Sequence, residues 1–291
     1  ICLTTTTTTV WGWADVLALV DRSSSMGLSM AGDEPCAPAG THCTTRWDAV
    51  RSALLNLVPW QSHVRWGTLV FPSPGAESCA VGPTPQVPVM ENAADAIGRA
   101  MSSVAPGGES PTGAAIRAAV AYLGDLADRD VKGIVLFTDG EPGCGGVDGG
   151  AAWAEALDAA AAAEAQGYPL FVFGLGPNPG DLDRLARAGG TDLYYPATSG
   201  QQLDDALGSI FWNPGDFVRS CSFATYEPPP DPTRVYVFLN GEPIPRDSND
   251  GWSFGSQNSY IVLNGESCER LQSLDAVELA ILFGCGDAGS P

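Results

Sequence analysis

The 291-residue sequence predicts an α/β protein: a doubly wound, mostly parallel six-stranded sheet with a small disulfide-stapled, β-rich C-terminal module. From Asp15 to Trp212, short apolar runs alternate with helical patterns, which is typical of a parallel sheet covered by helices on both faces. Most of the runs are uniformly apolar, as strands buried on both faces should be. After Trp212 the sequence becomes proline-rich and contains two short strands that end in Asn-Gly. We therefore expect an arm at residues 1–14, an α/β domain at 15–212 and the module at 213–291.

The elements of the α/β domain are predicted from these runs and from helix signals. Thr45 and Asp48 form a capping box, which opens a helix whose apolar face carries Trp47, Val50 and Leu54. The predicted strands are Val16–Val20, Val64–Phe71, Val87–Met90, Gly133–Thr138, Leu170–Leu175 and Leu193–Tyr195. The other predicted helices are Asn92–Val104, Gly113–Ala127, Ala151–Gln166, Gly180–Ala188 and Gly200–Phe211. In the module, Val235–Glu242 and Tyr260–Glu266 are the expected strands.

The N-terminal segment Leu3–Trp13 is of low complexity and contains a run of threonines. Threonine is β-branched and favours an extended backbone, whereas a threonine tract is also typical of an O-glycosylated spacer. Two interpretations stay open at this point. The segment is either a tether or a strand that pairs with a sheet edge, in its own subunit or in another one.

The charge of the chain excludes several classes of partner. The sequence has 34 Asp and Glu against 14 Lys and Arg, which gives a net charge of -20. This charge argues against binding of nucleic acid or anionic lipid, and it is compatible with a secreted protein that attracts divalent cations. No run of about 20 apolar residues is present, so no membrane-spanning segment is expected. The start at Ile1, without a signal-type core, is that expected of a processed mature form.

Eight cysteines without a CxxC or Cys/His cluster predict disulfides in an oxidising compartment, secreted or at a bacterial cell surface. The predicted topology separates them into two groups of four, one near the carboxyl ends of the strands and one at the far pole. Within the groups the pairing is open, with Cys36–Cys43 as the first choice, and Cys2 could instead carry a lipid. The first group is Cys36, Cys43, Cys79 and Cys144, and the second is Cys2, Cys221, Cys268 and Cys285.

Oxygen-bearing side chains follow two of the predicted strands and begin one helix. Asp21, Ser23 and Ser25 come directly after the first strand, and Asp139 follows the strand that ends at Thr138. Thr112 stands at the start of a helix after a glycine- and proline-rich loop. Ligands of open parallel sheets gather at the carboxyl ends of the strands. Carboxylate and hydroxyl oxygens suit Mg²⁺, Mn²⁺ or Ca²⁺, so a divalent cation is predicted here.

The D-x-S-x-S, Thr, Asp order of these residues resembles the metal-ion-dependent adhesion site of von Willebrand factor A and integrin inserted domains, which have a Rossmann-like sheet. The resemblance implies that Ser23, Ser25 and Thr112 coordinate the ion directly or through water, with Asp21 and Asp139 behind them. Mg²⁺ is the favoured ion, and Ca²⁺ and Mn²⁺ are alternatives. With two carboxylates around it, the ion keeps positive charge and an open position that a partner's carboxylate can fill.

The sequence is consistent with three functions. The leading one is an extracellular protein that binds a protein, matrix or glycan ligand through the cation, and the chain is similar to secreted or lipid-anchored bacterial A-domain proteins with a cysteine-bearing tail. The second is a structural subunit of a surface filament, joined through residues 1–14. The third is a metal-dependent hydrolase, for which Glu109 and Glu141 are the candidate bases. No catalytic motif is present and His42 and His63 are the only histidines, so an enzyme is not expected.

Overall fold

The computed structural model describes residues 3–8, 14–36, 43–61, 64–75, 78–126, 131–144, 146, 148–211, 221–224, 229, 231–255, 260–273 and 279–284. It divides into two compact units. The larger unit comprises residues 14–127 and 132–212, and the smaller one comprises residues 1–13, 128–131 and 213–291. The predictions that concern Cys2, Cys285, His42 and His63 fall outside the described residues.

The larger unit contains a six-stranded sheet with the order β4-β3-β2-β5-β6-β7. Its strands are β2 (Ala14–Asp21), β3 (Val64–Phe71), β4 (Val87–Met90), β5 (Val131–Thr138), β6 (Leu170–Leu175) and β7 (Tyr195–Ala197). β3 is parallel to β2, β6 is parallel to β5 and β7, and β4 is antiparallel to β3. The predicted mostly parallel sheet is therefore confirmed. The placement of the last strand was wrong, because Leu193 is half exposed and pairing with β6 begins only at Tyr195.

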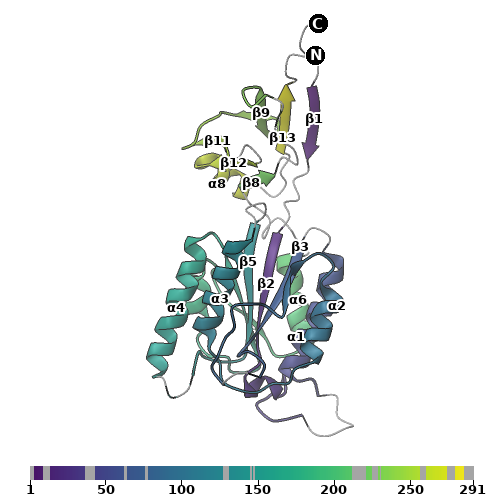
Figure 1. Cartoon of the computed structure of the whole chain (residues 1–291), viewed down its shortest axis with the longest axis vertical. Coiled ribbons are helices and arrows are strands. Elements are labelled where there is room, and N and C mark those ends of the chain that lie inside the picture. The colour runs from purple at the N-terminus through teal and green to yellow at the C-terminus, as the bar shows by residue number, and fades with distance from the viewer. Residues whose placement is uncertain are drawn as a thin grey trace. The chain divides into compact units, whose positions relative to one another are not determined.

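Helices cover both faces of this sheet (Figure 1). They are α1 (Arg46–Leu57), α2 (Ala94–Ser102), α3 (Thr112–Asp125), α4 (Gly149–Ala165), α5 (Asp183–Ala188) and α6 (Gly200–Phe211). Leu17, Leu19 and Leu136 belong to the buried cluster under α3 and α4. On the other face, the Trp66 ring lies 4.8 Å from the Phe211 ring of α6. The sheet thus has an apolar core on each face, which explains why its strands are rich in apolar residues.

The start of α1 follows the predicted capping box. The Asp48 amide donates to Thr45 Oγ1 at 3.0 Å, and the Thr45 hydroxyl donates to the Asp48 carboxylate at 2.9 Å. These bonds satisfy a free amide at the helix N-terminus. They also fix the position of Arg46, the first helical residue, which is buried.

The described residues of the smaller unit form two sheets and one helix. Its sheets have the orders β1-β13-β9-β10 and β11-β12-β8. The elements are β1 (Leu3–Thr8), β8 (Ser222–Ala224), β9 (Val235–Leu239), β10 (Glu242–Ile244), β11 (Gly251–Phe254), β12 (Tyr260–Asn264), α8 (Glu266–Ser273) and β13 (Leu279–Gly284). Asn240 and Gly241 have positive φ and form the β9-β10 turn, as the Asn-Gly sequence predicts, so Val235–Glu242 is not one continuous strand.

The threonine-rich segment is a strand of the same chain. β1 pairs antiparallel with β13, in a register that runs from Leu3 opposite Gly284 to Thr8 opposite Leu279. Of the two interpretations of this segment, strand pairing within its own subunit is therefore the one that the structure shows. The short polar helix α8 was not predicted from the sequence, and the Cys221–Cys268 disulfide ties it to the start of β8. In the described part of the chain, no helix is long and apolar enough to cross a membrane.

Candidate metal site

The predicted site residues come from three segments at one edge of the large sheet. Asp21 is the last residue of β2, Asp139 directly follows β5, and Thr112 is the first residue of α3. After Asp21 the chain turns into the short 3-10 helix η1 (Ser24–Gly27). The Ser23 amide donates to Asp21 Oδ1 at 2.7 Å, which holds this turn against the strand end.

Ser23, Ser25 and Asp139 form one half of a continuous oxygen network. The two serine Oγ atoms lie 3.1 Å apart, and Ser25 Oγ donates to Asp139 Oδ1 at 2.8 Å. This half links the loop after β2 to the end of β5, although Ser25 and Asp139 are 114 residues apart in the sequence.

Asp21 and Thr112 belong to the other half, and two hydroxyls that the sequence analysis missed join it. Ser110 Oγ donates to Asp21 Oδ2 at 2.7 Å and lies 3.2 Å from Thr112 Oγ1. The Thr138 hydroxyl also donates to Asp21 Oδ2, at 2.8 Å. Their nearness in sequence to Thr112 and Asp139 was the available signal. All five predicted residues thus lie in one hydrogen-bonded network.

A third missed residue, Arg46, contacts the site through Asp139. Its Nη1 donates to Asp139 Oδ2 at 2.6 Å, and both side chains are almost fully buried. The sequence offered no signal for this contact, because 93 residues separate the two and an arginine on a helix normally faces solvent.

The spacing and chemistry of the network fit a divalent cation. Adjacent oxygen ligands of an octahedral Mg²⁺ are about 3 Å apart, because each metal–oxygen bond is about 2.1 Å long and adjacent bonds are perpendicular. The Ser23–Ser25 Oγ separation of 3.1 Å and the Ser110–Thr112 separation of 3.2 Å match this spacing. The side-chain donors are all hard oxygens, the kind that Mg²⁺, Mn²⁺ and Ca²⁺ prefer. The residues present therefore fit the predicted ion.

The electrostatics of Asp21 also favour a cation. The pKa of the Asp21 carboxyl is raised from 3.8 to about 6, first by burial and second by the negative charge of Asp139. The hydrogen bonds from Ser110, the Ser23 amide and Thr138 lower the pKa without offsetting the burial. In the described part of the chain, no lysine or arginine lies within ion-pair distance of Asp21, and the guanidinium of the adjacent Arg22 donates to backbone carbonyls instead. A bound cation would therefore supply a close counter-charge.

Relative to Asp21→Asn, we expect the metal-free protein to lose stability as the pH rises from about 4 to about 6. Because the pKa of Asp21 is about 6 in the folded protein and 3.8 ordinarily, the folded state binds more protons in this interval. Folding is thus favoured by low pH at this residue, and the gain disappears as the pH passes through the folded pKa. The measurement is urea denaturation in EDTA across this range, with Asp21→Asn as the reference. A wild-type curve parallel to that of the variant would contradict the assignment.

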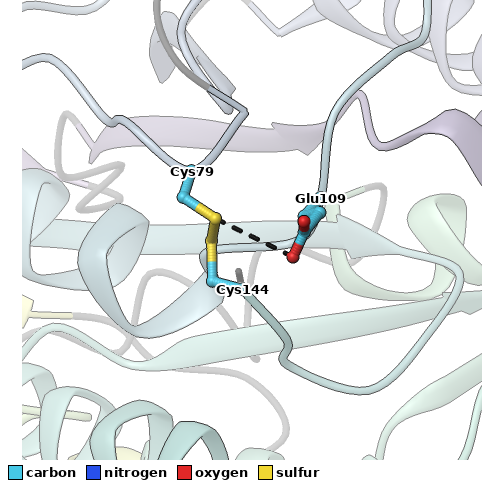
Figure 2. A group of neighbouring side chains, drawn as sticks. All are labelled: Cys79, Glu109 and Cys144. Carbon is cyan, nitrogen blue, oxygen red and sulfur yellow. Dashed lines mark hydrogen bonds between the residues drawn. A yellow bond between two sulfur atoms is a disulfide. The ribbon is translucent and has the colours of Figure 1, made fainter. Parts of the chain in front are cut away.

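A disulfide and backbone hydrogen bonds brace the loops of this site. Cys79 and Cys144 are joined, and Glu109 lies beside them, with its Oε2 3.8 Å from Cys79 Sγ (Figure 2). Ser110 and Gly143 exchange two backbone hydrogen bonds of 3.0 Å. The Cys79, Glu109 and Cys144 ligand atoms lie within 4.8 Å of one another. Sulfurs joined in a disulfide offer no thiolate to a metal, so this group acts as a brace between loops.

The disulfides agree with the predicted grouping of the cysteines. The first choice, Cys36–Cys43, is confirmed. The three disulfides of the described residues each join two members of the same predicted group; they are Cys36–Cys43, Cys79–Cys144 and Cys221–Cys268.

The fold and the oxygen network together define a doubly wound α/β domain of the kind that carries a ligand site at the carboxyl edge of its sheet. Residues 83–208 match the family model of the von Willebrand factor type A domain, and this part of the chain is therefore similar to that family. The matched residues include Thr112 and Asp139, and they begin after the Asp21–Ser25 segment. The comparison with curated proteins found no match.

Solved structures share this fold at low sequence identity. The PilB minor pilin from Streptococcus sanguinis has a TM-score of 0.56 and 15% identity, over 70% of this chain and 62% of the pilin. The pilus adhesin SpaC from Lactobacillus rhamnosus GG, in its open conformation, has a TM-score of 0.52 and 17% identity, over 98% of this chain and 40% of the adhesin. Proximal thread matrix protein 1 from the mussel byssus has a TM-score of 0.50 and 15% identity, over 72% of this chain and 48% of the matrix protein. The chain thus spans less than two thirds of each.

Proposed function

We propose that this protein is an extracellular binding protein that engages an acidic group of a protein, matrix or glycan ligand through a divalent cation. The observation that carries the proposal is the oxygen network that joins Asp21, Ser23, Ser25, Thr112 and Asp139 at one sheet edge. The disulfides support an oxidising, extracellular location. The likeness to a pilus adhesin supports a role at a cell surface.

The charges of the site favour an acidic ligand. When bound, the cation would act as a Lewis acid and accept a carboxylate oxygen from the partner. Asp21 and Asp139 are the carboxylates of the network, and the positive charge of Arg46 offsets that of Asp139. The Ser23, Ser25 and Thr112 hydroxyls are neutral donors. The protein groups therefore leave the cation with net positive charge, which attracts a further anion. Mg²⁺ is the favoured ion, with Mn²⁺ and Ca²⁺ as alternatives.

Asp21→Ala is expected to abolish binding of Mn²⁺ by an otherwise folded protein, because it removes the carboxylate that holds Ser23, Ser110 and Thr138. The measurement is calorimetric titration of the EDTA-treated protein with Mn²⁺, with circular dichroism to check folding. Ser24→Ala is the matched control, since the Ser24 hydroxyl lies in the same motif but bonds to the Gly108 carbonyl. Acetate added to the Mn²⁺-loaded protein should bind at the open position of the ion and displace water from it. Mn²⁺ binding that is unchanged in Asp21→Ala would refute the proposal.

A second candidate function is that of a subunit in a surface assembly joined through residues 1–14. β1 is the last strand of its sheet, and among the described residues no strand pairs with its outer edge. An exposed strand edge is a template for pairing with another chain, and the likeness to a minor pilin supports this use. Deletion of Ile1–Val10 should convert an assembled form into a monomer in light scattering. An oligomeric state that the deletion leaves unchanged would discard this candidate.

A hydrolytic role has weaker support than binding. Glu109 lies beside the Cys79–Cys144 disulfide. A Cβ added to Gly180 would lie 2.7 Å from Glu141 Cγ, so the Glu141 side chain packs against this glycine. A general base must reach the metal-bound water, and neither placement favours that. Phosphoester or peptide turnover that is lost in Glu141→Gln would overturn this preference for binding.

A further inference from the structure

Arg46 is held between two carboxylates of different exposure. Its Nη1 donates to Asp139 Oδ2 at 2.6 Å inside the protein, and its Nη2 donates to Asp33, whose side chain is 58% exposed. Nη2 also donates to the Gly32 carbonyl at 3.0 Å. The guanidinium therefore connects the site carboxylate to the loop between η1 and α1.

The surroundings of Arg46 fix its side chain in this position. A Cβ on Gly176 would lie 2.7 Å from both Nε and Nη2 of Arg46, and Gly176 has a φ of +86°, which favours glycine. Among the described residues, Arg46 Nε has no hydrogen-bond partner. The two ion pairs at the other nitrogens offset part of the desolvation cost of this nitrogen.

The charge of Arg46 acts directly on the site. Asp139 Oδ2 is engaged by Arg46, and Asp139 Oδ1 accepts the Ser25 hydroxyl at 2.8 Å. Both carboxylate oxygens are thus oriented, and the negative charge of Asp139 is neutralised at close range. A cation in the network would be attracted less strongly by this carboxylate than by an unpaired one. It would keep more positive charge for an acidic ligand.

We propose that Arg46 is a positioning residue that lowers the affinity of the site for the cation and raises the affinity of the bound cation for the acidic ligand. Asp33, in the neighbouring loop, sets the strength of this effect. The inference rests on the proposed function. Asp33 competes with Asp139 for one guanidinium. Removal of the Asp33 charge leaves more of the Arg46 charge on Asp139, whereas removal of the Arg46 charge frees Asp139 altogether.

The two changes should therefore shift Mn²⁺ affinity in opposite directions. Arg46→Gln should bind Mn²⁺ about tenfold more tightly, because loss of a full charge near a divalent ion outweighs one neutral hydrogen bond. Asp33→Asn should bind Mn²⁺ about threefold more weakly, since the Asp33 charge is partly screened by solvent. Arg46→Lys keeps the charge and should stay near the wild-type affinity. Acetate affinity of the Mn²⁺-loaded variants should change with the opposite sign.

Two matched controls accompany these variants in the full chain. Arg51→Gln removes a charge from the same helix, where Arg51 pairs with Asp48 at 3.4 Å, and Glu34→Gln removes the charge next to Asp33. Both should leave Mn²⁺ affinity unchanged. If Arg46→Gln fails to fold, Asp33→Asn against Glu34→Gln decides the question.

The outcomes separate this inference from the proposed function. A wild-type protein that binds no Mn²⁺ removes the proposed function and the inference with it. A wild-type protein that binds Mn²⁺, with Arg46→Gln and Arg46→Lys both weakened, shows that Arg46 has a structural role only and overturns the inference alone. Asp33→Asn with the affinity of Glu34→Gln overturns the assigned role of Asp33.

Discussion

Asp139→Asn is expected to abolish Mn²⁺ binding and to destabilise the metal-free protein by about 3 kcal/mol, because it leaves a buried guanidinium without its buried partner. The Arg46 side chain is only 4% exposed, and its other ion pair is to the more exposed Asp33. For a unit of this size the loss corresponds to a fall in Tm of about 6 to 12 °C. Urea denaturation in EDTA measures the change, and titration with Mn²⁺ measures the loss of the site.

Asp21→Asn is the matched control for this prediction, since it makes the same chemical change at the other site carboxylate. Asp21 is fully buried with a raised pKa, so its charge opposes folding at neutral pH in the absence of a cation. Asp21→Asn should therefore lose Mn²⁺ binding without the loss of metal-free stability expected for Asp139→Asn. Equal destabilisation by both variants would contradict the contrast between a paired and an unpaired carboxylate.

Much of the fold was predictable because its elements have strong local signals. The strands β3 and β6 are rich in apolar residues, and their predicted bounds agree with the structure. The capping box at Thr45 and Asp48 placed the start of α1. The smaller unit was harder to predict, because its strands are short and their pairing is non-local. β1 and β13 lie at opposite ends of the chain, and no local pattern indicates that such segments pair.

The candidate site, like the fold, was predictable from the sequence only in part. The motif order and the rule for parallel sheets were sufficient to place Asp21, Ser23, Ser25, Thr112 and Asp139 at one edge, where the structure links them through hydrogen bonds. Arg46 was not predictable, because its role arises only when α1 packs beside the end of β5. A buried ion pair between distant segments leaves no periodic trace in the sequence. The charge balance at the site therefore could not be predicted from the sequence and is seen only in the structure.

The Cys79→Ser, Cys144→Ser double variant is expected to lower the free energy of unfolding by about 4 kcal/mol. The disulfide closes a loop with a sequence separation of 65, and the loss of loop-closure entropy in the unfolded chain grows with that length. Cys36→Ser, Cys43→Ser is the control, since its separation of 7 corresponds to about 2 kcal/mol. Chemical denaturation of the two double variants measures both effects.

The same variant should also weaken Mn²⁺ binding by about tenfold, because a site with mobile loops must be ordered when the ion binds. Cys144 directly follows Gly143, whose backbone bonds hold Ser110 beside Asp21 and Thr112. Loss of the disulfide frees this segment from the loop that contains Cys79, and the hydroxyl network loses its fixed geometry. If the variant lost stability but kept wild-type Mn²⁺ affinity, the backbone bonds between Ser110 and Gly143 would be sufficient on their own to hold the site geometry. A loss of both would show that the covalent brace preorganises the site.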